Sequence, residues 1–274
     1  MTRTLVGKVT SLWRYPVKSM LGERLDAVEV TPTGVLGDRA YALWDIQTQR
    51  IASAKNPKKW AKLLEFQATF IKSPQPQAAM PPVRFALPDG DLATSNDSNI
   101  DRVLSQLLGR DVELLRTVPE TPSLDQYWPD LEGAANRDTV TQLFMPAGTF
   151  FDSCPIHALT TATLARLQHL YPEGQFEPAR FRPNIFIEPT AAESTFIEND
   201  WVGSQMTIGD EVCLSIDTAC PRCVVTTVAQ SDLPTDLNIL RTTAQHNNSI
   251  AGIRASVLRS GSIRCGDPIW LEAN

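Results

Sequence analysis

Short segments rich in β-branched and aromatic residues, separated by proline or glycine, run through most of this chain. Such segments are typical of strands bounded by turns. They predict strands over residues 5–13, 24–31, 39–45, 112–115, 180–188, 205–209, 212–217, 223–228, 252–258 and 267–271. The 20 prolines and 14 glycines provide enough turns to connect that many strands. We therefore expect a mostly β protein.

Helical spacing is confined to a few stretches. Apolar residues recur at helical intervals over 99–108, and Gly109 then ends the predicted helix. Further helices are predicted over 56–64, 158–171 and 237–245. Because strands and helices do not alternate regularly, the fold class is α+β, mostly β, with a β-barrel-like core. Residues 118–149, with four prolines and weak periodicity, are interpreted as the connection between a β-rich N-terminal domain (1–120) and a second domain (121–274).

Composition excludes several classes of function. Apolar residues make up 42% of the chain, which excludes intrinsic disorder. The net charge of −6 argues against a nucleic-acid partner, because such proteins need a basic surface. We find no apolar run long enough for a membrane span and no signal peptide at the start. An odd number of cysteines, five, suits a reducing compartment, so a cytoplasmic location is expected.

The segment Cys220-Pro221-Arg222-Cys223 carries the most chemical information. Two cysteines at this spacing can form half of a zinc site, but neither a second such pair nor a histidine pair completes it. A redox disulfide would want the motif at the start of a helix, whereas here it leads into a predicted strand. Arg222 lies next to Cys223 and would favour its thiolate form, which soft metals require. Two cysteines that simply pack as small apolar residues are the ordinary alternative.

Three other short segments are rich in hydrogen-bond donors. Lys18 and Ser19 end a strand, Arg39 follows a tight turn, and Arg182 and Asn184 alternate along a predicted strand and so face the same side. Taken singly, each has an ordinary interpretation as a solvated strand end or turn. Together they suit a phosphate and a polar heterocycle. No Walker or G-x-G-x-x-G loop is found, so nucleotide binding by those routes is not supported.

Six segments in this order resemble a known family. They are YPVKS (15–19), LGDR (36–39), RFRPN (180–184), DWVG with a following IGD (200–210), CPRCVVTTV (220–228) and GDP (266–268). This set is similar to proteins that carry a MOSC N-terminal domain followed by a MOSC domain, among them the mitochondrial amidoxime-reducing components and their bacterial relatives. The resemblance covers essentially the whole chain. It implies a β-rich N-terminal domain packed on a MOSC β-barrel with a few helices.

The resemblance also implies a cofactor. The family binds a pyranopterin molybdenum cofactor (molybdenum-molybdopterin), with one cysteine as a ligand to the metal. By position in the motif, that metal-binding and catalytic cysteine is Cys223. The matching cofactor-binding residues are Lys18, Ser19, Arg39, Thr160, Thr161, Arg182, Asn184, Arg222 and Cys223. Pyridoxal phosphate is not expected, because the chain lacks the cysteine-desulfurase domain that some eukaryotic relatives add.

The expected function is reduction of N-hydroxylated compounds at their N–O bond. We find no iron–sulfur signature, haem-attachment motif or nucleotide loop in the chain. Electrons would therefore come from a separate redox partner, such as a ferredoxin or a b-type cytochrome with its reductase. Two alternatives stay open at this point. One is a cofactor carrier or sulfur-transfer protein with a persulfide on Cys223 or Cys220, and the other is a structural barrel with chance cysteines.

Overall fold

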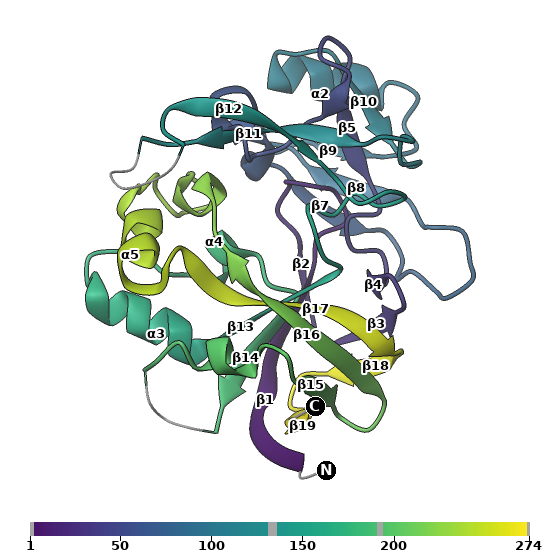
Figure 1. Ribbon diagram of the computed structural model, residues 1–274. Coiled ribbons are helices and arrows are strands. Elements are labelled where there is room, and N and C mark those ends of the chain that lie inside the picture. Colours follow the sequence, from purple (N-terminus) through teal and green to yellow (C-terminus); the bar gives the residue numbers. More distant parts are fainter. Residues whose placement is uncertain (1–2, 131–135, 191–193, 273–274) are drawn as a thin grey trace.

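A seven-stranded barrel forms the lower half of the molecule in the computed structural model, which describes residues 3–130, 136–190 and 194–272 (Figure 1). The strands around it are, in order, β1 (Arg3–Arg14), β14 (Ile185–Pro189), β13 (Ile156–Thr160), β17 (Ile250–Arg259), β16 (Val212–Pro221), β15 (Gln205–Ile208) and β19 (Pro268–Glu272). The pairing of β1 with both β14 and β19 closes the barrel. The expected α+β, mostly β class with a barrel is confirmed.

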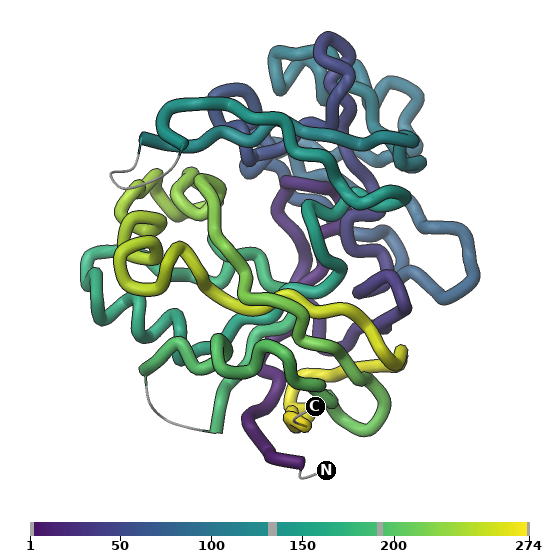
Figure 2. The backbone as a smooth tube through the Cα atoms, viewed as in Figure 1, coloured from purple at the N-terminus to yellow at the C-terminus, as the bar shows by residue number. Residues whose placement is uncertain are grey.

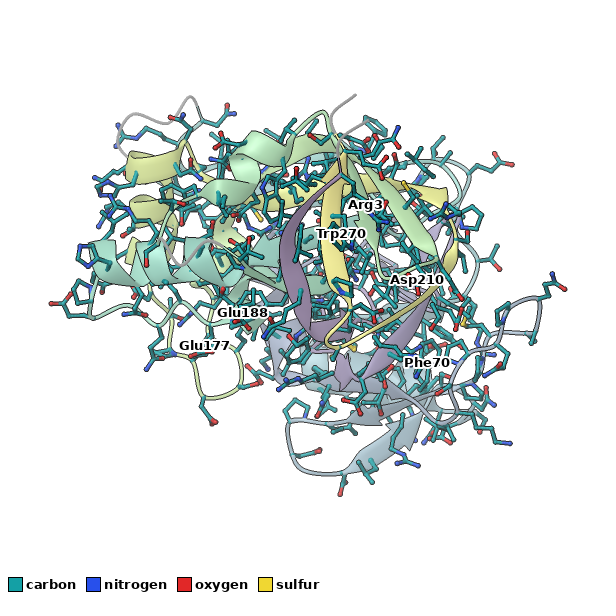
Figure 3. All side chains as sticks on the ribbon, turned by 90° about the horizontal axis from the view of Figure 1, so that it is seen from below. Arg3, Phe70, Glu177, Glu188, Asp210 and Trp270 are labelled. Atoms are coloured by element: carbon teal, nitrogen blue, oxygen red, sulfur yellow. The ribbon has the colours of Figure 1, made fainter. Side chains whose placement is uncertain are left out.

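The barrel closes because its strands carry apolar side chains on alternate positions. Along β16, Val212, Leu214 and Ile216 are buried, and the residues between them are partly exposed. This period of two directs one set of side chains into a shared core. Figure 2 shows that the two ends of the chain lie side by side at the base of the barrel. There Arg3 of β1 lies over the ring of Trp270 of β19, 4.8 Å from its centroid (Figure 3).

A second group of sheets forms the upper half of the molecule (Figure 1). Its five-stranded sheet runs β10 (Val112–Leu115), β5 (Ala42–Asp45), β6 (Arg50–Ile51), β11 (Ser123–Trp128) and β12 (Thr139–Phe144). A three-stranded sheet joins β7 (Gln67–Phe70), β8 (Val83–Ala86) and β9 (Leu92–Thr94). Both pack with α1 (Pro57–Trp60), the 3-10 helix η1 (Ala61–Glu65) and α2 (Ile100–Leu108) around one apolar core. The helix predicted over 99–108 agrees with α2, which Gly109 ends at φ +68°.

The remaining elements cover the barrel. Strand β2 (Glu23–Leu25) extends it beside β1, and β18 (Gly261–Arg264) pairs with β3 (Ala27–Thr31), which in turn pairs with β4 (Gly34–Val35). Helices α3 (Thr161–Leu170), α4 (Pro178–Phe181) and α5 (Asn238–Asn247) lie to one side, with the 3-10 helices η2 (Ile197–Trp201) and η3 (Val224–Thr227) (Figure 1). None of the helices that the structure describes is long and apolar enough to cross a membrane.

The two halves exchange strands. Strand β1, the first element of the chain, belongs to the barrel of the C-terminal strands. Strands β11 and β12 belong to the upper sheet, although they fall in the stretch 118–149 predicted to be a connection. That prediction was wrong over 123–144, and residues 131–135 lie outside the described residues. The division at residue 120 stays a prediction, and in space the halves are interleaved.

Near the cleft, the strand predicted over 180–188 is confirmed only from Ile185, and the strand predicted over 223–228 is wrong. Residues 178–181 form α4 and Arg182 adopts a left-handed conformation, so β14 begins three residues later, at Ile185. Pro178 favours a helix start, and Pro183 prevents the helix from continuing. Residues 224–227, predicted as a strand, form η3 instead, because the Thr227 hydroxyl donates to the Val224 carbonyl at 2.7 Å. The helix predicted from 158 begins at 161 because residues 156–160 form β13.

Candidate functional site

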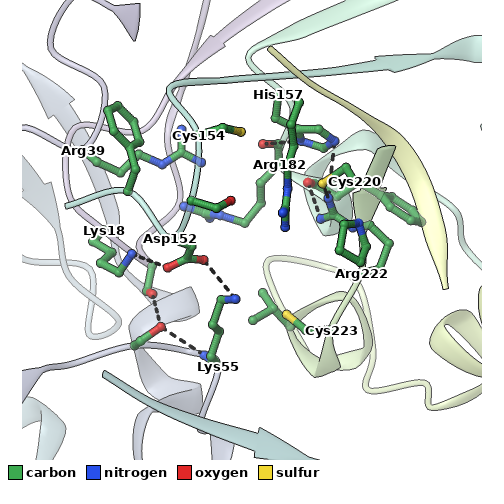
Figure 4. A pocket seen from close by; sticks show the side chains of 18 of the residues that line it. Lys18, Arg39, Lys55, Asp152, Cys154, His157, Arg182, Cys220, Arg222 and Cys223 are labelled. Atoms are coloured by element: carbon green, nitrogen blue, oxygen red, sulfur yellow. Dashed lines mark hydrogen bonds and ion pairs between the residues drawn. The ribbon is translucent and has the colours of Figure 1, made fainter. Parts of the chain in front are cut away.

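A cleft lies between the two halves (Figure 4). Seven of the nine predicted cofactor-binding residues line it: Lys18, Ser19, Arg39, Arg182, Asn184, Arg222 and Cys223. They come from segments that are far apart in sequence. Cys220, the alternative persulfide site, also lines the cleft. The sequence placed none of the other lining residues in a site: Ser53, Lys55, Phe151, Asp152, Ser153, Cys154, His157, Phe181, Pro221, Val225 and Arg254.

Three of the lining residues have left-handed backbone conformations. Ser19, Arg39 and Arg182 have φ values of +65°, +48° and +55°. For a residue other than glycine, this backbone conformation costs on the order of 1 kcal/mol and is typical of binding sites. The buried carboxylate of Asp38 stabilises the arrangement. It accepts hydrogen bonds from the Tyr15 amide (2.7 Å), the Asn184 side chain (2.9 Å) and the Arg39 guanidinium.

Tyr15 separates two of these arginines. The guanidinium carbons of Arg39 and Arg182 lie 4.5 and 4.2 Å from the centroid of its ring. The Tyr15 hydroxyl donates to the Pro183 carbonyl. Burial raises the pKa of Tyr15 to about 12, so the ring stays neutral and both cations are held by cation–π attraction. The ring therefore orients two positive groups in the cleft.

Arg182 is buried, and its terminal nitrogens make no hydrogen bond to the described residues. Its exposed fraction is 8%. Burial lowers its pKa to about 10, which still leaves it charged at neutral pH. An unpaired buried donor of this kind costs free energy until a ligand satisfies it. The two free nitrogens fit a bidentate anion such as a phosphate.

A carboxylate bridges two lysines on the other side of the cleft. Asp152 accepts from Lys18 at 2.5 Å through one oxygen and pairs with Lys55 at 3.4 Å through the other. Burial would raise the pKa of Asp152, but Lys18, Lys55 and Arg39 outweigh burial and hold that pKa well below its usual range. Burial lowers the pKa of Lys18, which also donates to the Phe150 carbonyl at 2.7 Å. Lys18 and Asp152 are therefore satisfied within this cluster, whereas Lys55 makes only long contacts.

In the segment Cys220-Pro221-Arg222-Cys223, the arginine contacts a different cysteine from the one predicted. Arg222 donates hydrogen bonds to the Cys220 sulfur at 3.0 Å and to the Phe181 carbonyl at 2.6 Å. Its guanidinium therefore contacts Cys220 rather than Cys223. Burial would raise the pKa of Cys220, yet His157 and Arg222 lower that pKa well below its ordinary value. Cys223 instead faces Lys55 across the cleft (Figure 4). The expected effect of Arg222 on a thiol is present, but on the other cysteine.

The other predicted residues have structural partners. Asn184 lines the cleft, but its amide donates to Asp38 and its oxygen accepts from the His157 backbone at 3.1 Å. Thr160 caps α3 and donates to the buried Glu198 at 2.7 Å. Thr160 and Thr161 are not among the residues that line the cleft, so their assignment to the cofactor stays a prediction.

Five titratable residues of the cleft belong to none of the quoted motifs: Lys55, Asp152, Cys154, His157 and Arg254. A signal in the sequence could have identified one group, because Asp152-Ser153-Cys154 directly precedes strand β13. Burial raises the pKa of Cys154 to about 11, which keeps this thiol protonated. Within residues 3–130, 136–190 and 194–272, no three histidine, cysteine or acidic side chains are arranged to hold a metal. A metal here would need ligands from a cofactor in addition to a protein thiolate.

The barrel and its cationic, thiol-bearing cleft define a class of protein. The MOSC domain family matches residues 147–270, and the MOSC N-terminal beta barrel domain family matches residues 6–74. The chain is a MOSC-domain protein, with the N-terminal domain preceding the MOSC domain, as the sequence motifs indicated.

Several curated relatives align over most of the chain. The human mitochondrial amidoxime reducing component 2 is 27% identical over 97% of this chain and 83% of its own length. The protein of the same name from Bos taurus is 25% identical with the same coverage. Among solved structures, the YUAD protein from Bacillus subtilis covers 100% of this chain and 98% of its own, with a TM-score of 0.50 and 12% identity. At that identity the structural likeness concerns the fold alone.

Proposed function

We propose that this protein binds the molybdenum cofactor in the cleft and reduces N-hydroxylated compounds at their N–O bond. The observation that carries the proposal is the buried Arg182, whose two terminal nitrogens lack partners among the described residues in a cleft that also exposes a thiol, Cys223. An anionic cofactor would satisfy the guanidinium, and Cys223 would provide the protein ligand to the metal. The relatives named for amidoxime reduction support the choice of reaction.

When bound, the cofactor would supply a two-electron redox centre, and the protein would supply binding and orientation. Arg182 would hold an anionic group of the cofactor, and Lys18 and Arg39 would add positive charge around it. Asp38 and Tyr15 would fix the arginines in place. The overall reaction converts a hydroxylamine, two electrons and two protons into an amine and water, so the site must also admit protons.

The electrons would come from a separate protein. Curated relatives are named as components, which fits a role within a larger electron-transfer system. A ferredoxin, or a b-type cytochrome with its reductase, has the required chemistry. Metal-loaded protein should therefore reduce a hydroxylamine with reduced viologen or with such a partner, and it should fail with NADH or NADPH alone. Turnover driven by NADH in preparations free of any reductase would contradict this part of the proposal.

The decisive test combines metal analysis with turnover. Protein purified from a host that makes the cofactor should contain close to one molybdenum per chain and should reduce an amidoxime or hydroxylamine with reduced viologen. Arg182→Met should lower molybdenum content, while Arg166→Met, which changes a half-buried arginine outside the cleft, should not. Protein without molybdenum, or loaded protein without turnover, would contradict the proposal.

All five cysteines are free in the structure, which supports the proposed cytoplasmic location.

A sulfur-transfer role is the second candidate, and one observation favours it. Arg222 and His157 stabilise the thiolate form of Cys220, and a thiolate is the form that accepts a sulfane sulfur. Incubation with a persulfide donor, followed by mass spectrometry, would test it. A persulfide on Cys220 that passes to an acceptor thiol, without turnover of any N-hydroxylated compound, would favour this role over reduction.

A further inference from the structure

Lys55 lies on the wall of the cleft opposite Cys223. It follows β6 and precedes α1, so it comes from the upper half of the molecule, whereas Cys223 belongs to the MOSC domain. Its side chain is 13% exposed. Figure 4 shows its ammonium group between Asp152 and the Cys223 sulfur. Lys55 therefore faces the atom to which we assign the metal.

The contacts of Lys55 are longer than those of the neighbouring cation. Its ammonium group lies 3.4 Å from an Asp152 oxygen and 3.5 Å from the side-chain oxygen of Gln126. Lys18, in contrast, makes bonds of 2.5 and 2.7 Å to Asp152 and the Phe150 carbonyl. An ammonium group has three donors. Each lysine makes two contacts, but those of Lys55 are at the limit of hydrogen-bond distance. Lys55 is therefore the more available of the two to a molecule placed beside Cys223.

We propose that Lys55 selects the substrate by charge, so that this site prefers N-hydroxylated compounds with a carboxylate or similar anionic group near the N–O bond. This inference rests on the function proposed above and names its substrate class. Arg39, Arg182, Arg222 and Arg254 also line the cleft, and Asp152 is already paired with two lysines. A cationic substrate would meet like charges in a partly desolvated space, which weakens binding, whereas an anionic one would gain a charge-assisted bond.

The first test needs no cofactor. Iodoacetate and iodoacetamide alkylate the same sulfur but differ in charge, so their rate ratio at Cys223 reports the local preference. That ratio, measured by mass spectrometry and normalised to a small thiol, should fall about tenfold in Lys55→Glu and severalfold in Lys55→Met. Any change in the thiolate fraction of Cys223 cancels in the ratio. Lys55→Arg should retain the wild-type value.

Lys58→Met is the matched control. It removes the same charge three residues away, from an exposed lysine that pairs with Asp138 outside the cleft. The ratio should stay at the wild-type value in this variant. An unchanged ratio in a folded Lys55→Met variant would overturn the proposal, as would an equal fall in Lys58→Met. Lys55→Gln provides a second neutral variant if the methionine variant melts early.

The second test uses the metal-loaded protein and reduced viologen. Two aryl hydroxylamines, one with a para carboxylate and one with a para trimethylammonium group, differ in charge but share the reacting bond. Wild type should favour the carboxylate in kcat/KM, and Lys55→Glu should reduce that preference at least about tenfold. Turnover of both compounds with the same preference in both proteins would overturn this inference alone. No turnover of either would contradict the proposed function, and the alkylation ratio would then still test Lys55.

Discussion

The two walls of the cleft hold their positive charges in different ways. On the wall from the upper half, Lys18 and Arg39 are paired with the carboxylates Asp152 and Asp38. On the wall from the MOSC domain, Arg222 contacts a sulfur and a carbonyl, and the terminal nitrogens of Arg182 have no partner in the described part of the chain. Lys18 and Arg39 are thus satisfied without a ligand, and among the described cations of that wall Lys55 alone remains available to one. On the MOSC wall, the terminal nitrogens of Arg182 await a partner.

Because of this difference in pairing, the cations of one wall should contribute mainly to folding stability and those of the other mainly to ligand binding. A buried cation with a carboxylate partner contributes to the stability of the empty protein, because removing it leaves the carboxylate poorly compensated. A buried cation without a partner costs stability until a ligand arrives. The MOSC wall should therefore decide cofactor binding, and the opposite wall should decide stability and charge preference. Substitutions on the upper wall should lower the stability of the apoprotein, whereas substitutions on the MOSC wall should lower its cofactor content.

The largest expected effect concerns the two cysteines of the MOSC wall. Cys223→Ser should abolish viologen-driven hydroxylamine turnover and alter the molybdenum absorption spectrum, because the serine hydroxyl cannot replace a soft thiolate ligand. Circular dichroism should show that the fold persists. Cys220→Ser should keep a substantial fraction of the turnover. Equal loss in both variants would point to a paired-thiol or persulfide mechanism instead.

The second prediction compares Lys18 with Arg182 directly. Lys18→Met should lower the free energy of unfolding of the apoprotein by about 2 kcal/mol, because a charged hydrogen bond is lost and Asp152 keeps only Lys55 and Arg39 nearby. Arg182→Met should leave apoprotein stability unchanged or raise it, yet reduce molybdenum content by at least about tenfold. Denaturant unfolding and metal analysis measure the two effects. If both variants changed stability and molybdenum content in the same way, the distinction between the two walls would be wrong.

A third prediction uses pH. The pKa of Asp152 is lower in the folded protein than in the unfolded chain, so its ionised form stabilises the fold above the ordinary carboxyl pKa of about 3.9. That contribution is lost as the pH falls below this value toward the lowered pKa. Wild type should therefore melt a few degrees above Asp152→Asn at pH 6, roughly 3 °C for each kcal/mol. The gap should close progressively between about pH 4 and pH 2. A gap that widens toward acid would contradict the assigned direction.

The smallest expected effect concerns thiol reactivity. Because Cys220 has a lowered pKa and Cys154 a raised one, a small thiol reagent at pH 7 should label Cys220 before Cys154. Arg222→Met should slow labelling of Cys220 severalfold by removing its guanidinium. Peptide mass spectrometry at short times distinguishes the sites. Faster labelling of Cys154 than Cys220 in wild type would show that access, rather than the thiolate fraction, controls the reaction.

Much of the fold could be predicted from local patterns. Alternating burial along β16, the helical spacing of α2 and the glycine that ends it were all evident in the sequence. Motif order also predicted seven of the residues that line the cleft. The strand and helix patterns are local, since each depends on side chains within a few positions of one another, whereas the motifs indicated the site through a family resemblance along the whole chain. Patterns of that kind are what a sequence specifies most directly.

Other features were missed. The strand predicted over 180–188 begins only at Ile185, and the one predicted over 223–228 is absent, because proline positions and a threonine hydrogen bond favour short helical turns there. Strands β11 and β12 have weak periodicity, and β12 is largely exposed, so they were not recognised as part of the upper sheet.

The amino-acid sequence by itself determined most of the barrel strands, though not β13, and also the family motifs and the chemical groups available for a cofactor. The tertiary structure decided how those groups are used. Arg222 is adjacent to Cys223 in sequence, yet the turn after β16 directs its guanidinium to Cys220. Lys55 belongs to no motif, yet it faces Cys223 because the two halves fold across one cleft. The physical reason is that electrostatic and hydrogen-bond energies depend on distance in space, which sequence separation does not set.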